Sequence, residues 1–123
     1  SANIKNDILE MMSKFGKSNY AAIKELYEIN TKMAGQFYDQ QMAIMNLSVE
    51  YATSNMEILG KSKGYKEVVS GQTALLSETS EKVQGIARNT VDIMNESKDE
   101  VAAWVEKGVV DAASIVPFTQ KTA

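Results

Sequence analysis

The sequence contains no cysteine and no histidine. Without cysteine there is neither a disulfide framework nor a thiolate nucleophile. Without histidine the chain lacks the commonest metal ligand and the commonest general base of enzymes. A phosphate-binding loop is also missing, because Gly60, Gly64 and Gly71 do not have the spacing that such loops require. These absences predict a protein that is not an enzyme and that uses no metal or other cofactor.

An excess of charge of one sign is absent as well. The 123 residues include 13 Lys and Arg against 16 Asp and Glu, which gives a net charge of −3. This weakly acidic balance argues against a nucleic-acid partner, which a basic patch would indicate. No apolar run approaches the roughly 20 residues of a membrane span, and no secretory signal precedes the first helical pattern. We therefore expect a cytoplasmic protein without a transmembrane segment.

Proline is almost absent, and Pro117 is the only one. Everything before it is free of the residue that breaks helices most strongly. The clearest break is the segment Gly60–Tyr65, where glycine and polar residues cluster, and we interpret it as the main turn. A weaker break lies at Gly16–Asn19, where Ser18 or Asn19 would cap a following helix.

Apolar residues on both sides of the main turn recur at the period of a helix, with steps of three and four residues. One helix is expected from about Asn19 to Leu59 and another from about Tyr65 to Ala113. In the second helix, two successive steps of four, from Ile93 through Ser97 to Val101, interrupt the heptad pattern. Strand signals are poor throughout, so the sequence predicts an all-α fold.

The first residues form a third predicted element, because Ile4, Ile8, Met11 and Phe15 share one helical face. We therefore predict a short amphipathic helix over residues 1–18, a helical hairpin over 19–115 with its turn near 60–65, and a C-terminal tail over 116–123. The two long helices are expected to pair in a coiled-coil-like arrangement.

The apolar stripe of each long helix is wider than a single partner helix can cover. We expect the excess to be covered by other copies of the chain or by a foreign hydrophobic surface. Polar residues within the stripe, such as Gln40 and Thr90, set the register at a cost in stability. Seven methionines would adapt such a surface to an irregular partner, although core filling explains them equally well.

The residues predicted to form this hydrophobic surface and oligomer interface are Ile23, Leu26, Met33, Phe37, Ile44, Leu47, Tyr51, Ile58, Leu76, Val83, Ile86, Ile93, Val101 and Trp104.

Three stretches of the second half, Tyr65–Gln72, Ile86–Ile93 and Glu96–Gly108, are similar to the phasins, the proteins that coat polyhydroxyalkanoate granules in bacteria. The resemblance covers roughly residues 20–110 and is strongest over 65–108. The similarity lies in the helical pattern and in these short stretches of sequence rather than in a catalytic signature. It implies a non-enzymatic, often oligomeric protein of long amphipathic helices that binds the granule surface in the cytoplasm and limits granule coalescence.

Two other functions remain open at this point. One is an oligomeric helical scaffold whose apolar stripe binds a specific protein partner. The other is a protein that binds the membrane interface, which the acidic net charge disfavours because anionic lipids attract Lys- and Arg-rich helices.

Overall fold

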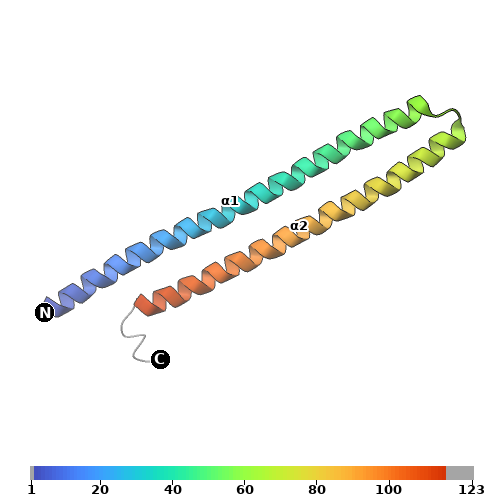
Figure 1. The fold of residues 1–123 in the computed structure, drawn as a ribbon. Helices are drawn as coiled ribbons and strands as arrows, with labels where there is room; N and C mark the ends of the chain where they lie inside the picture. Colours follow the sequence, from blue (N-terminus) through green and yellow to red (C-terminus); the bar gives the residue numbers. More distant parts are fainter. Residues whose placement is uncertain (1, 116–123) are drawn as a thin grey trace. The chain divides into compact units, whose positions relative to one another are not determined.

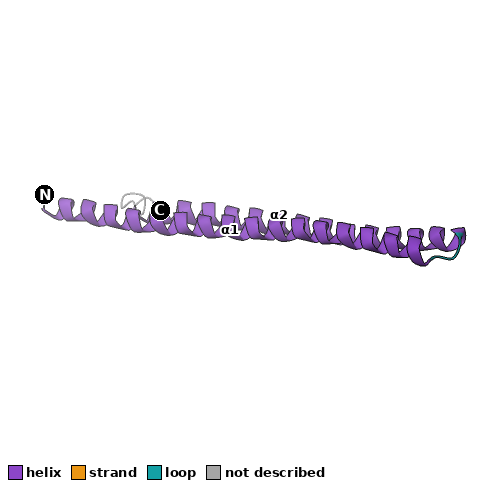
Figure 2. Cartoon of the chain, turned by 90° about the horizontal axis from the view of Figure 1, so that it is seen from above, coloured by secondary structure: helices purple, strands orange, loops and turns teal. Residues whose placement is uncertain are grey.

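The computed structural model of the protein describes residues 2–115, and nearly all of them are helical (Figures 1 and 2). Helix α1 runs over Ala2–Lys61 and helix α2 over Tyr65–Ile115. The predicted all-α fold with two long helices is confirmed. The predicted tail over 116–123 lies outside the described residues.

The predicted short N-terminal helix is wrong, because α1 passes through Gly16–Asn19 without interruption. No described glycine has a positive φ, so Gly16 keeps the ordinary helical conformation. A single glycine costs a helix only about 1 kcal/mol relative to alanine. Ser18 and Ala22, which follow the glycine, are half-buried against α2, and this packing outweighs a weak break.

The connection between the helices is residues 62–64, which lie inside the Gly60–Tyr65 segment. The amide of Ser62 donates to the carbonyl of Ile58 at 3.0 Å, which completes the last turn of α1. The amide of Lys63 donates to a carboxylate oxygen of Glu67 at 2.6 Å. A carboxylate in the first turn of a helix satisfies a free amide and also favours the helix dipole. Glu67 therefore fixes where α2 begins.

The described chain divides into two compact units. Unit 1 combines α1 up to Met33 with α2 from Glu96 onward, and unit 2 is Ala34–Asn95. Within unit 2, hydrogen bonds and ion pairs join Gln40 to Thr90 and Glu50 to Lys82, so the two segments are antiparallel. Within unit 1, Ala22 meets Trp104 and Glu25 meets Lys107.

Helix packing in these units produces a seam rather than a core. Ile29 is the one buried apolar residue among those described, and Ser97 is the one buried polar residue. No described side chain is more than 98 % buried, and the other residues of the seam are half-buried. A helix with one neighbour can cover only one stripe, so most of its surface stays in contact with water.

The continuity of α1 can be tested at Gly16, where an added Cβ would meet nothing within 4 Å. We expect Gly16→Ala to stabilise the helix by about 1 kcal/mol, because alanine has the higher helix propensity. Circular dichroism would record the helix content and the thermal midpoint.

Gly71→Ala is the matched control. A Cβ at Gly71 would lie 3.0 Å from Cγ2 of Ile58, so the gain in propensity is opposed by crowding at the seam. Equal stabilisation by both variants would contradict the packing described for Gly71, and no gain from Gly16→Ala would contradict an unbroken α1.

Candidate functional site: an uncharged helical face

The described residues contain no group of three or more His, Cys, Asp and Glu side chains placed to hold a metal ion. Within the same residues, neither helix has an apolar stretch that would let it span a membrane. The feature that stands out is instead the distribution of apolar and charged side chains around the two helices.

The packed rows of unit 2 consist of the half-buried residues of both helices that recur at steps of mostly three and four. On α1 they are Gln36, Gln40, Ala43, Leu47, Ser54 and Ile58, and on α2 they are Val68, Gly71, Leu75, Thr79, Ile86, Thr90 and Ile93. Met42, Asn55 and Gly85 are half-buried beside these rows.

Several exposed apolar residues come directly after a packed residue in the sequence. Phe37, Ile44 and Leu59 follow packed residues of α1 and are 38 %, 54 % and 56 % exposed. Val69 and Leu76 follow packed residues of α2 and are 44 % and 62 % exposed. One step along a helix is a rotation of about 100°. Because the two segments are antiparallel and face each other, the same rotation carries both sets to the same side of unit 2.

No charged residue follows a packed position of unit 2 on either helix. We call the surface formed by these following residues the uncharged face of unit 2. On α1 it contains Phe37, Gln41, Ile44, Ser48, Asn55 and Leu59, and on α2 it contains Val69, Gln72, Leu76, Ser80, Ala87, Val91 and Met94.

Charged residues occupy the opposite edge of unit 2. Asp39 and Glu78 each precede a packed position, which is the reverse rotation. The ammonium group of Lys82 lies 3.2 Å from Glu50 and 3.4 Å from Glu78. The hydrogen bond to Glu50 is the main cause that raises the pKa of Lys82 above its ordinary value, and Glu78 adds to it. A charged lysine between two carboxylates keeps this edge hydrated.

Unit 1 also carries ion pairs along one edge, but its other side is not free of charge, because Lys98 follows the buried Ser97. On one edge Lys32 lies 2.7 Å from Glu100 and 2.8 Å from Glu96, and Lys107 lies 3.4 Å from Glu25. The hydrogen bonds to Glu100 and Glu96 raise the pKa of Lys32 well above that of an ordinary lysine. These pairs are solvent-exposed, so they add little stability and mainly define a charged edge.

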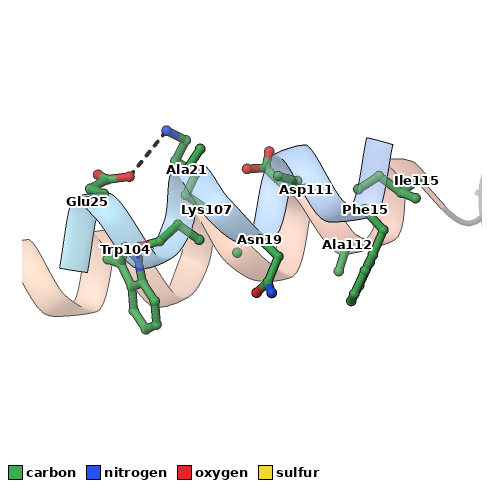
Figure 3. Close-up of a pocket in the computed structure, with 12 residues that line it drawn as sticks. Phe15, Asn19, Ala21, Glu25, Trp104, Lys107, Asp111, Ala112 and Ile115 are labelled. Atoms are coloured by element: carbon green, nitrogen blue, oxygen red, sulfur yellow. Dashed lines mark hydrogen bonds and ion pairs between the residues drawn. The ribbon is translucent and has the colours of Figure 1, made fainter. Parts of the chain in front are cut away.

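The close-up in Figure 3 shows the two sides of unit 1 directly. Glu25 and Lys107 point to one side of the helix pair, whereas Asn19, Phe15 and the ring of Trp104 point to the other. On this second side of α1, Ile23 and Tyr27 are 60 % and 70 % exposed. Phe15, Asn19 and Trp104 line a pocket of ≈ 290 Å³, whose other lining residues include the small Ser18, Ala22 and Gly108.

Two polar contacts fix how the helices meet. In unit 1 the indole N–H of Trp104 donates to the carbonyl of Ala22 at 2.8 Å. In unit 2 the side-chain amide of Gln40 donates to the carbonyl of Ile86 at 3.2 Å and to the hydroxyl of Thr90 at 3.3 Å. A shift of one helix along the other would leave these half-buried groups unpaired, which is costly.

The structure divides the predicted interface residues into two groups. The half-buried residues of the seam are Leu26, Met33, Leu47, Ile58, Ile86, Ile93, Val101 and Trp104. The exposed residues are Ile23, Phe37, Ile44, Tyr51, Leu76 and Val83. The predicted stripe is thus wider than one helix covers, and Phe37, Ile44 and Leu76 of its uncovered part lie on the uncharged face of unit 2.

On α1, several packed positions lie one residue before a predicted interface residue. Ala22, Gln36 and Ala43 pack against α2, whereas the larger Ile23, Phe37 and Ile44 beside them stay exposed. Small side chains let two helices approach closely, which the hydrophobicity pattern alone does not reveal. The seven-residue spacing from Ala22 through Ile29 and Gln36 to Ala43 was the available signal.

Ile44 and Leu47 allow the two groups to be separated, because they lie three residues apart on α1 but differ in exposure. We expect Leu47→Ser to destabilise the protein by about 1 kcal/mol more than Ile44→Ser, since only Leu47 loses seam packing. Serine has the same low helix propensity at both sites, so the difference in thermal or urea midpoints isolates packing. Equal midpoints would contradict the assignment of Leu47 to the seam.

Comparison with known proteins gives one family and one relative. The sequence model of the family described as "Phasin protein" matches residues 10–109. An uncharacterised protein of Allochromatium vinosum is 24 % identical over 107 residues, which cover 87 % of this chain and 89 % of the relative. No solved structure matches the chain significantly.

Proposed function

Because the chain belongs to the phasin family, whose members are structural proteins associated with polyhydroxyalkanoate granules, we propose that it coats such granules through the uncharged face of unit 2. The coat is non-enzymatic and cytoplasmic, and it limits the coalescence of granules. The observation that carries this proposal is that the uncharged face of unit 2 combines exposed apolar side chains with an absence of charge, whereas ion pairs such as Lys82–Glu50 lie on the opposite edge.

Adsorption through this face removes apolar surface from water. Each 100 Å² of apolar area so removed contributes about 2.5 kcal/mol. Leu76, Ile44 and Val83 are 62 %, 54 % and 51 % exposed and would contribute directly. The two helices do not need to separate for adsorption, since these exposed residues already lie on one side of the pair. The helix pair therefore adsorbs as it stands.

The charged edge supports the second part of the proposal, which is protection against coalescence. With the uncharged face on the polymer, Lys82 and its partners Glu50 and Glu78 remain hydrated at the outside of the coat. A hydrated, charged layer on each granule opposes direct contact between two polymer surfaces. Such a layer also covers the polymer against other proteins.

In solution the same face needs a different cover, and we propose that copies of the chain cover one another. Exposed apolar side chains that share one side of a helix pair favour self-association. The oligomer would then be the stored form of the coat, and adsorption would replace contacts between copies by contacts with polymer. Among the predicted interface residues, the exposed group is the one that exchanges partners.

A new charge placed on either side of α1 tests the face directly. Ser48 follows a packed residue and lies on the uncharged face, whereas Asn46 lies beside Glu50 and Lys82. Both residues are exposed, and both variants to glutamate add the same net charge. We expect Ser48→Glu to weaken adsorption to polyhydroxybutyrate granules about tenfold or more, because a carboxylate must be desolvated there. Asn46→Glu should adsorb as the parent does.

Co-sedimentation with purified granules measures this difference, with phospholipid vesicles and buffer alone as controls. Saturable pelleting that is selective for granules supports the coat. Equal weakening by both glutamate variants would show that charge alone, rather than its position, governs adsorption. A folded helical protein that does not pellet at all would contradict the coat and favour the scaffold with a protein partner.

A further inference from the structure

The uncharged face of unit 2 is not purely apolar, because it also carries side-chain amides. Gln41 and Asn55 lie on α1, and Gln72 lies on α2. Nε2 of Gln72 donates to Oδ1 of Asn55 at 3.1 Å, which links the two helices across the face. Gln41 is exposed and has no hydrogen-bond partner within the described part of the chain.

These amides present hydrogen-bond donors that carry no charge. A side-chain amide has two N–H groups, so Gln72 keeps one after its bond to Asn55. Asn55 uses only its oxygen in that contact, and both of its N–H groups remain available. Together with Gln41 the face thus offers several free N–H donors between exposed apolar side chains such as Ile44 and Leu76.

This combination matches the chemistry of a polyester surface. Each ester unit has oxygen atoms that accept hydrogen bonds but no group that donates one, and it has no charge. A hydrocarbon surface offers no acceptor, so the amides would lose their water there without replacement, which is unfavourable. An anionic lipid surface would instead call for lysine and arginine, and both are absent from this face.

We propose that Gln41, Asn55 and Gln72 make the face selective for an ester-bearing polymer over a hydrocarbon of equal area. The proposal rests on the proposed coat function and adds the residues that determine its specificity. The apolar side chains supply adsorption to any hydrophobic surface, whereas the amides penalise surfaces that cannot accept hydrogen bonds.

The test compares adsorption to poly(3-hydroxybutyrate) particles and to polyethylene particles of the same size. We expect the parent protein to bind the polyester at least tenfold more tightly. Replacing the three amides by leucine should strengthen binding to polyethylene about tenfold or more, because no amide is then left unpaired, and should remove most of the selectivity. Gln41→Leu alone breaks no hydrogen bond in the described chain and should shift the ratio in the same direction by severalfold.

Asn46→Leu combined with Asn89→Leu is the matched control, because both asparagines lie beside Glu50 and Lys82 on the charged edge. It adds apolar area of the same kind and should leave the ratio of the two affinities unchanged. Circular dichroism verifies that each variant keeps its helix content.

The outcomes separate the two proposals. A parent protein that binds both particles equally would overturn the selectivity and leave the coat function intact. A parent protein that does not bind the polyester would overturn the coat function. Selectivity that persists in Gln41→Leu and in the triple variant, or that is lost equally in the control, would overturn the role of the amides.

Discussion

In each unit of this protein a helix packs against only one other helix, and this constraint determines where every apolar side chain can go. A single neighbour covers one stripe, which here is filled by half-buried residues such as Ala43 and Leu47. The sequence supplies more apolar residues than that stripe can hold. The remaining apolar residues are exposed. The sequence determines on which side of the helix pair they lie, without changing the fold.

The side on which an exposed residue lies depends on whether it directly follows or directly precedes a packed residue. In unit 2, residues directly after a packed position are uncharged, and several charged residues come directly before one. In an antiparallel pair, the residues directly after packed positions of both helices lie on one side, and the residues directly before them lie on the other. This rule gives one uncharged side and one charged side. Lys82 with Glu50 and Glu78 marks the charged side, and Ile44 with Leu76 marks the other. A surface protein needs this arrangement, because it must meet polymer and water at once.

The sequence predicted the parts of the fold that depend on local chemistry. The scarcity of proline and the helical period indicated two long helices, and the cluster of glycine and polar residues at Gly60–Tyr65 indicated the connection. The break at Gly16 was wrong because the local cost of one glycine is smaller than the packing gained by Ser18 and Ala22 after it. The packing of Ala22 and Ala43 was not predicted, since the size of a side chain, which governs close approach, does not follow its hydrophobicity. The amides of the uncharged face were not recognised, because only the structure places Gln72 beside Asn55.

The central claim is that the uncharged face of unit 2 contacts the granule while the charged edge stays in water. The chain has no cysteine, so single labels can be introduced by Ile44→Cys and Asn46→Cys without other changes. An environment-sensitive fluorophore at each site would be read before and after adsorption to polyhydroxybutyrate particles. We expect the emission of the label at position 44 to shift to the blue on adsorption and that of the label at position 46 to remain as in water. A blue shift at both positions, or at position 46 alone, would contradict adsorption through this face.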